Sequence, residues 1–228
     1  MGLPSPFDED ADRYDRWFDR HPAAYAAELA AVRQLWPGGS RCLEVGVGSG
    51  RFAAPLGIRE GVDPSPAMRR LARARGIEAV EGRAENLPYP DGSFDAVLMV
   101  TTLCFVDDVD ASLREAYRVL RPGGSLVVGL IDPHSPPARA YLQQVRQSPF
   151  YRGVRFRTPA EVVGAMERAG LRDFAFCQTL FRPPAEVEAD EPVRQGYGEG
   201  LFVVVRGVRL GSCTPAAGIR RAGQLRGQ

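Results

Sequence analysis

The sequence predicts an α/β fold in which a doubly wound, mostly parallel sheet carries helices on both faces. Short apolar runs alternate with helical segments between residues 41 and 131, the order expected of a parallel sheet. The runs at 42–45 and 94–100 are almost continuously apolar, as strands covered on both faces are. The chain has 228 residues, 44% of them hydrophobic and 25% charged, which suits a single domain with a core of ordinary size.

The N-terminal segment predicts a helix with a break in it. Residues 1–12 are expected to be flexible, whereas residues 14–35 are rich in alanine and have apolar positions at helical spacing. Pro22 interrupts this helix because proline disfavours helical backbone in the residue before it, which is His21. A Pro-Gly-Gly run at 37–39 ends the helix.

Strands and helices then alternate along the chain. The predicted elements are a strand at 41–46, a short helix from about Arg51, a strand at 58–63, a helix at 65–75, and strands at 77–81 and 94–100. Ser65 as N-cap and Pro66 at the first helical position mark the start of the helix at 65–75. A helix at 109–119 and a strand at 125–131 follow.

The alternation stops at residues 132–157, where we expect an insertion with a helix over 138–147. Thr158 and Glu161 then have the spacing of a capping box, which opens another helix. The last predicted elements are strands near 171–181 and 201–206, an acidic connection at 186–200, and a polar, basic tail at 211–228 that we expect to be disordered.

The most informative motif is the glycine-rich turn after the first strand, in the sequence LEVGVGSGRF at 43–52. Gly46, Gly48 and Gly50 allow a tight turn and a close approach of ligand atoms to the backbone. Asp63 ends the second strand at the same edge of the sheet, where its carboxylate can accept hydrogen bonds from a ribose diol. The same residues also fit an ordinary tight turn and an acid that caps the following helix.

Two classes of nucleotide ligand fit this motif. A dinucleotide site requires G-x-G-x-x-G, whereas the sixth position here is Arg51. Glu44 places a negative charge near the turn, which suits the positively charged S-adenosylmethionine better than a pyrophosphate. An NAD(P)-dependent oxidoreductase is therefore the less favoured alternative.

Later motifs extend the pattern. The segments GVDPS, AENLPYPDGSFDAV and LRPGGSL follow LEVGVGSG in the order and at the intervals of class I S-adenosylmethionine-dependent methyltransferases. The chain resembles their type 11 group, which methylates small molecules, and uncharacterised single-domain prokaryotic members of it. The resemblance implies a seven-stranded sheet of order 3-2-1-4-5-7-6 with strand 7 antiparallel. It also implies S-adenosylmethionine as cofactor, S-adenosylhomocysteine as product, an N-terminal helical lid at 1–36 and a Rossmann-like methyltransferase domain at 37–210.

The resemblance also implies a set of cofactor-binding residues at the strand ends and in the first helix. They are Glu44, Gly46, Gly48, Asp63, Pro64, Met68, Ala84, Glu85, Val100, Thr101, Tyr14 and Trp17. Arg83 stands where many relatives carry an aspartate, so one expected adenine contact is absent. Structural alternatives remain, such as a solvated loop charge for Glu85 and an ion pair of Glu44 with Arg51 or Arg41.

No residue is an unmistakable catalyst. His134 follows the fifth strand and is a candidate general base, with a surface-loop position as the alternative. Tyr14 is a second candidate, in a helix whose aromatic rings are expected to cover the cofactor or simply to pack on the domain. The insertion at 132–157 is expected to form part of an acceptor pocket. The expected reaction is direct in-line transfer of a methyl group to a small-molecule acceptor.

Composition limits the partners. A net charge of +1 gives no electrostatic case for nucleic acid, and no apolar run reaches the length of a membrane span. The four cysteines show no metal-binding or disulfide spacing, so we expect no metal site, reduced thiols and a cytoplasmic protein. We expect a monomer or a weak homodimer. A protein that binds S-adenosylmethionine without catalysis is the main alternative function.

Overall fold

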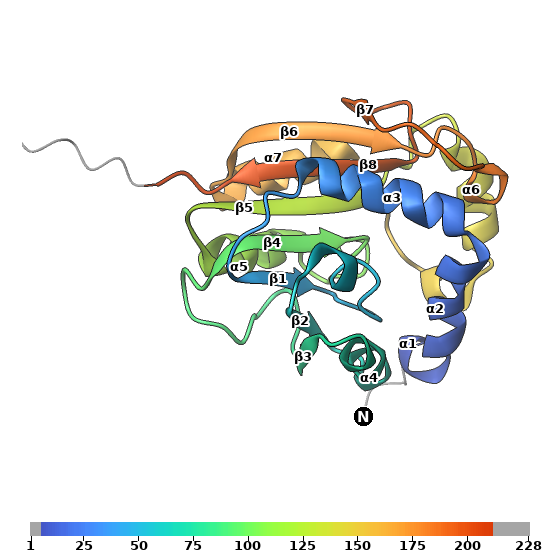
Figure 1. The fold of residues 1–228 in the computed structure, drawn as a ribbon. Coiled ribbons are helices and arrows are strands. Elements are labelled where there is room, and N and C mark those ends of the chain that lie inside the picture. Colours follow the sequence, from blue (N-terminus) through green and yellow to red (C-terminus); the bar gives the residue numbers. More distant parts are fainter. Residues whose placement is uncertain (1–5, 212–228) are drawn as a thin grey trace, which may run out of the picture.

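The computed structural model describes residues 6–211, which form one eight-stranded sheet with helices around it (Figure 1). The strands are β1 (Cys42–Val45), β2 (Glu60–Asp63), β3 (Glu78–Glu81), β4 (Phe94–Val100), β5 (Leu120–Ile131), β6 (Arg172–Thr179), β7 (Arg194–Gln195) and β8 (Phe202–Val208). Their order is β3-β2-β1-β4-β5-β8-β6-β7. Strands β1 to β5 pair in parallel, and β8 runs antiparallel to β5 and β6. The predicted order is confirmed with β8 as strand 7, and the two-residue β7 is an addition at the edge.

Helices cover both faces of this sheet, as predicted. They are α1 (Pro6–Glu9), α2 (Ala11–Arg20), α3 (Pro22–Leu35), α4 (Pro66–Ala74), α5 (Val109–Val119), α6 (Ala138–Val145) and α7 (Pro159–Ala169). Three 3₁₀ helices, η1 (Ala54–Leu56), η2 (Pro149–Tyr151) and η3 (Pro184–Glu186), lie in the connections. Buried residues of α3 and α4 belong to one hydrophobic cluster, and those of α5 and α7 belong to a second on the opposite face.

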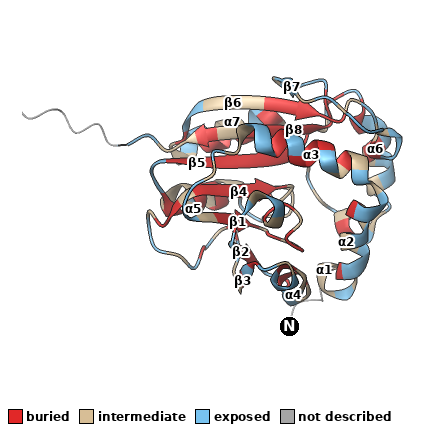
Figure 2. Cartoon of the chain, in the orientation of Figure 1, coloured by how far each residue is buried: buried red, intermediate tan, exposed pale blue. Residues whose placement is uncertain are grey.

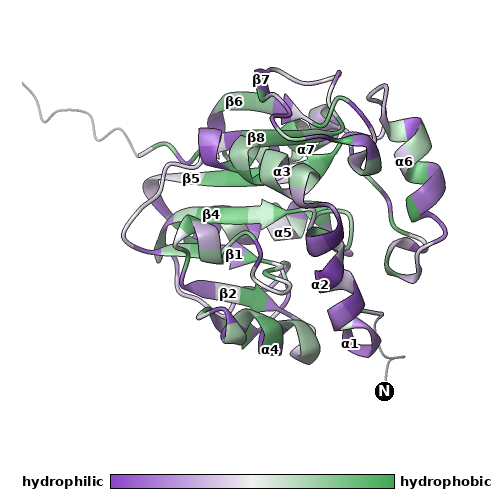
Figure 3. Cartoon of the chain, turned by 45° about the vertical axis from the view of Figure 1, so that its right-hand side comes forward, coloured by the Kyte–Doolittle hydropathy of each residue, from purple (hydrophilic) through white to green (hydrophobic). Residues whose placement is uncertain are grey.

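Strand β4 shows why its sequence is apolar at successive positions. Leu98 and Val100 belong to the cluster that α3 covers, whereas Val97 and Met99 belong to the cluster that α5 and α7 cover. All four side chains are buried. The central strands are accordingly buried in Figure 2 and hydrophobic in Figure 3, as strands covered on both faces must be.

The helix starts follow the predicted capping chemistry. The Ser65 hydroxyl accepts a hydrogen bond from the Met68 amide at the start of α4. Thr158 and Glu161 form a complete capping box at the start of α7. The expected break at His21 separates α2 from α3.

Two predictions about local structure are wrong. The short helix expected from Arg51 is a turn followed by η1, because Gly57 adopts a left-handed conformation and ends the 3₁₀ turn after three residues. Residues 6–12, which were expected to be flexible, form α1 and the start of α2 with only Asp10 between the two helices. The predicted tail lies, after residue 211, outside the described residues. No helix in residues 6–211 is long and apolar enough to cross a membrane.

The carboxyl ends of the parallel strands are the edge of the sheet at which a ligand-binding site is expected. The parallel strands β1, β2 and β4 end on the side where α1, α2 and α6 gather (Figure 1). Ligands of open α/β sheets bind at this edge, outside the carboxyl ends of the strands.

Candidate functional site

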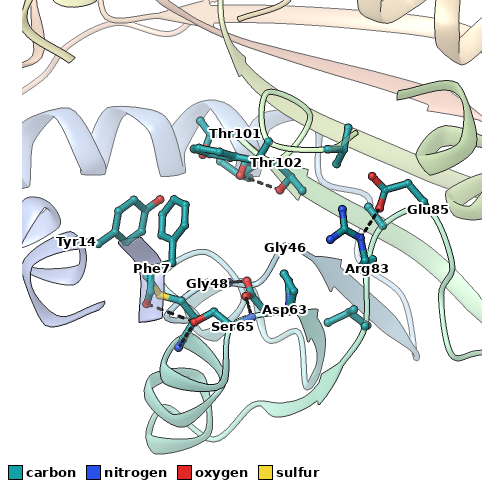
Figure 4. Close-up of a pocket in the computed structure, with 18 of the residues that line it drawn as sticks. Phe7, Tyr14, Gly46, Gly48, Asp63, Ser65, Arg83, Glu85, Thr101 and Thr102 are labelled. Atoms are coloured by element: carbon teal, nitrogen blue, oxygen red, sulfur yellow. Dashed lines mark hydrogen bonds and ion pairs between the residues drawn. The ribbon is translucent and has the colours of Figure 1, made fainter. Parts of the chain in front are cut away.

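A cavity of about 230 Å³ lies at the carboxyl ends of β1, β2 and β4, and we call it the first cavity (Figure 4). It brings together the predicted cofactor residues Tyr14, Gly46, Gly48, Asp63, Pro64, Met68, Ala84, Glu85, Val100 and Thr101. Glu44 and Trp17 do not line it. These residues come from four strand ends and from α2 and α4, so the fold alone assembles them.

The glycine-rich turn forms the floor of the first cavity. Gly46 has φ of +69°, and a Cβ atom there would lie 2.5 Å from Cγ2 of Thr102. The Thr102 hydroxyl donates to the Val45 carbonyl at 3.0 Å, which fixes this neighbour in place. Gly48 has φ of +52°, and nothing lies within 4 Å of where its Cβ would be. A side chain at position 46 would clash with Thr102, so glycine is required there. At position 48 glycine leaves the backbone open to the cavity.

Asp63 ties this turn to the end of β2. Its carboxylate accepts hydrogen bonds from the Gly48 amide at 2.8 Å and from the Ser65 amide at 2.9 Å. Asp63 is only 8% exposed, and burial raises its pKa, although the two amides and Arg69 oppose this. A carboxylate offers about four acceptor positions, so two remain for a diol in the cavity. Ser65, not Asp63, caps α4.

Glu44 lies behind the turn rather than in the cavity wall. It is 2% exposed, and burial raises its pKa well above the ordinary value. The suggested ion pairs do not form, because Arg51 pairs with Asp15 and Arg41 pairs with Glu60. Oε2 of Glu44 has no hydrogen-bond partner among the described residues. A buried acid with one oxygen unpartnered, and with the Ala53 backbone as hydrogen-bond partner, thus lies directly behind the glycine-rich turn.

The opposite wall comes from the loop after β3. Arg83, Ala84 and Glu85 all line the cavity. The Glu85 carboxylate accepts from the Asp107 amide at 2.8 Å, and Arg83 pairs with both Glu85 and Asp107. Glu85 is therefore not simply a solvated charge, since it joins two loops at the cavity rim.

The N-terminal helices close the first cavity from above. Phe7 and Asp8 of α1 line it, and the Ser65 hydroxyl donates to the Asp8 carboxylate at 2.5 Å. Neither residue was expected in the site, because residues 1–12 were expected to be flexible. The signal was present in Pro6 followed by Asp8 and Glu9, since proline and acidic residues favour the first turn of a helix.

A second cavity, of about 260 Å³, adjoins the first and lies between α2, α3 and α6. Tyr14, Val100 and Thr101 line both cavities. Thr101 has φ of +50°, an unusual conformation for a β-branched residue that costs roughly 1–3 kcal/mol. Such strain is characteristic of functional sites, and here it occurs where the two cavities meet. Trp17 lies in the wall of this second cavity.

The two candidate catalytic residues have different positions. Tyr14 is half-buried between the cavities, and desolvation raises its pKa well above the ordinary value, so its phenol remains protonated at neutral pH. His134 is exposed and lines neither cavity, and its backbone amide donates to Asp132. The insertion reaches the second cavity instead through Tyr141, Phe150 and Tyr151, among others.

The comparisons with known proteins agree with this geometry. The family model described as "Methyltransferase domain" matches residues 43–128. A crystal structure of an S-adenosylmethionine-dependent methyltransferase from Thermotoga maritima, described as a possible histamine N-methyltransferase, has a TM-score of 0.85 and 49% identity over 89% of this chain and 98% of that one. The chain belongs to the class I S-adenosylmethionine-dependent methyltransferases.

Other relatives are similar to this chain over nearly its whole length. An uncharacterised protein of Methanocaldococcus jannaschii is 37% identical over 204 residues, 90% of this chain and 98% of its own length. An uncharacterised protein of Mycobacterium tuberculosis is 39% identical over 214 residues, 91% of this chain and 75% of its own length. Members of this family use S-adenosylmethionine as methyl donor.

The residues of the methyltransferase's first cavity fit that donor. The unpartnered oxygen of Glu44 behind the turn suits a positively charged ligand, and the free acceptor positions of Asp63 suit a ribose diol. The apolar side chains of Met68, Ala84 and Val100 provide walls for an adenine ring. No α-helix among the described residues begins directly after the turn, so a pyrophosphate lacks the helix N-terminus that dinucleotide sites provide.

Glu28 is a residue of the second cavity that the sequence reasoning missed. It lies on α3, where the sequence predicts only a helix with apolar positions at helical spacing. The signal was a single acid in the alanine-rich segment AAELAA, which has no charged neighbour to explain it. A buried charge in such a segment requires a partner or a function.

Proposed function

We propose that this methyltransferase binds S-adenosylmethionine in the first cavity and methylates a small molecule, held in the second cavity, by direct in-line displacement. The supporting observation is that the two cavities meet at Tyr14, Val100 and Thr101. A methyl group at that junction is reachable from both sides. S-adenosylmethionine, when bound, supplies a methyl group already activated by its positively charged sulfur.

The residues of the chain then have to orient the acceptor and exclude water. Both tasks can lower the barrier by several kcal/mol without a dedicated catalyst. Helix α2 supports this role, because Tyr14 lines both cavities and Trp17 and Phe18 line the second. His134 lines neither wall, and the ring of His21, which lines the second cavity, stacks on Trp17 with its Nδ1 3.0 Å from the Trp17 carbonyl; both positions favour orientation over a histidine base.

The proposal includes the partners. The size of the second cavity favours a free small molecule over a nucleic acid or a membrane lipid, in agreement with the net charge of +1. The description of the Thermotoga maritima relative as a possible histamine N-methyltransferase also supports a small organic acceptor. We further propose that the chain acts in the cytoplasm as a monomer or a weak homodimer.

Calorimetry with S-adenosylhomocysteine, S-adenosylmethionine and NADH tests the cofactor. We expect binding of the first two in the micromolar range and none of NADH. A preference for NADH overturns the assignment in favour of an oxidoreductase.

Turnover tests the catalysis. Incubation with S-adenosylmethionine and a panel of amines, phenols, thiols and carboxylates should release S-adenosylhomocysteine, measured by mass spectrometry, with at least one class. The matched control is Asp63→Ala, which should lower the release with every acceptor. Tight cofactor binding without release on any acceptor supports a non-catalytic binding protein instead.

A further inference from the structure

The second cavity combines aromatic rings with one buried acid. Its wall includes the rings of Tyr14, Trp17, Phe18, Tyr141, Phe150 and Tyr151, which come from α2, α6 and the segment around η2. Glu28 enters the same wall from α3. Aromatic faces attract cations, and a carboxylate attracts them more strongly.

Glu28 has no structural partner. It is 6% exposed, and it makes no hydrogen bond or ion pair with any residue in 6–211. Burial raises its pKa to about 8. A buried carboxyl group without a partner costs free energy, and a helix packed on a sheet does not need one.

The charged groups nearest the cavity do not neutralise Glu28. Arg13 lines the cavity but pairs with Asp10, and Arg20 donates to the Arg16 carbonyl. The ring of His21 stacks on that of Trp17 at 4.7 Å. The cationic side chains of the wall are therefore engaged elsewhere.

The acidic groups around Glu28 all remain protonated near neutral pH. Burial, and then the charges of groups that include Glu28, raise the pKa of Tyr14, Tyr141 and Tyr151 well above the ordinary value. Burial also raises the pKa of Cys104, a neighbour of these phenols, to about 12. The cavity thus offers an acid and phenol hydroxyls to a ligand, with no compensating cation.

We infer that the second cavity binds an organic cation, a small amine whose ammonium group pairs with Glu28 and whose apolar part packs against the aromatic rings. This inference rests on the proposed function, because it takes the second cavity as the acceptor site and thereby names the acceptor as an amine. A carboxylate ligand would keep Glu28 protonated and gain no ion pair, and a neutral alcohol would also leave the acid without an ion pair. An ammonium ion supplies the missing partner and a charge-assisted hydrogen bond.

Size-matched probes test the inference with the full chain saturated with S-adenosylhomocysteine. The probes are 2-phenylethylamine, 2-phenylethanol and 3-phenylpropionate, measured by calorimetry. We expect the amine to bind at least tenfold more tightly than the alcohol or the acid. Amine binding at neutral pH should also release close to one proton, seen as a dependence of the binding heat on the buffer, because Glu28 ionises when the ammonium arrives.

The decisive variant is Glu28→Gln, which keeps the shape of the side chain. It should weaken 2-phenylethylamine binding at least tenfold and abolish the proton release, while 2-phenylethanol and S-adenosylhomocysteine bind within about twofold of wild type. The matched control is Glu186→Gln, an exposed acid beside the cavity residues Pro184 and Ala185, which should change none of these values.

The outcomes separate this inference from the proposed function. Retained binding of S-adenosylhomocysteine with no amine preference, or with equal amine affinity in wild type and Glu28→Gln, overturns the inference and leaves the proposed function standing. Failure of S-adenosylhomocysteine to bind overturns the proposed function, whereas Glu28-dependent binding of the amine to the free protein still supports a cation site.

Discussion

The ion pairs of Asp15 should hold α2 in place over the two cavities, and we call this contact the Asp15 latch. Its side chain is 14% exposed and accepts hydrogen bonds from Arg51 at 2.8 Å and from Arg75 at 2.7 Å. Both arginines belong to the domain beneath α2, Arg51 after the glycine-rich turn and Arg75 at the end of α4. The substitution Asp15→Asn removes the charge and keeps the shape.

The pKa of Asp15 gives the magnitude. Burial opposes ionisation, but the hydrogen bonds from Arg51 and Arg75 outweigh it and lower the pKa from 3.8 to about 2. At roughly 1.36 kcal/mol per pKa unit, the docked state favours the carboxylate by about 2 kcal/mol. Asp15→Asn should therefore raise the population of undocked α2 roughly 30-fold. Because the pKa in the docked state is the lower one, this contribution is complete above about pH 4 and is lost as the pH falls toward 2.

Native-state hydrogen exchange of the α2 amides measures this population directly. Asp15→Asn should speed their exchange by the same factor, and the rate of S-adenosylhomocysteine release should rise with it. The control is Asp19→Asn, which removes the second ion-pair partner of Arg51. The Asp19 side chain is 59% exposed, so its ion pair with Arg51 should contribute less than about 1 kcal/mol. Exchange in Asp15→Asn as slow as in wild type, or an equal effect in Asp19→Asn, would refute the latch.

Three further predictions concern the first cavity and its surroundings. Asp63→Ala should weaken S-adenosylhomocysteine binding by about 1–3 kcal/mol in calorimetry, and unchanged affinity would contradict the ribose role. The same variant should lower the Tm, because the amides of Gly48 and Ser65 lose their acceptor. Gly46→Ala should lower the free energy of unfolding by about 1–3 kcal/mol in urea titration, since its Cβ would meet Thr102; wild-type stability contradicts this. His134→Ala should leave both affinity and Tm unchanged, and any loss of methyl transfer would return it to the mechanism.

The fold and the first cavity could be predicted because their signals are local in the sequence. Glycine at 46 and 48 is fixed by backbone geometry and by the space left for a ligand. Asp63 is placed by the strand before it, and Ser65 by the helix after it. The contacts of Asp63 with the amides of Gly48 and Ser65 are local in the sequence, whereas the clash that excludes a Cβ at Gly46 comes from Thr102 on a later strand end.

The ion pair of Arg51 and the second cavity depend on tertiary structure and could not be predicted from the sequence. The side chain of Arg51 pairs with Asp15 of α2, 36 residues earlier, a contact that no local pattern predicts. Glu28 appears in the sequence as one acid on an apolar helix, and only the packing of α2, α3 and α6 makes it the wall of a cavity. Periodicity reports which face of a helix is buried, but not whether that face meets a core or a pocket.

The two cavities should open together when α2 moves, while Glu28 stays in place. Tyr14 on α2 lines both cavities, so undocking α2 exposes the donor side and the acceptor side at once. Glu28 lies on α3, which packs against β5, β6 and β8 and is separated from α2 by the break at His21. The acid therefore remains fixed to the sheet when α2 moves. It follows that weakening the Asp15 latch should speed product release and acceptor entry by similar factors, whereas Glu28→Gln should change acceptor affinity and leave both opening rates alone.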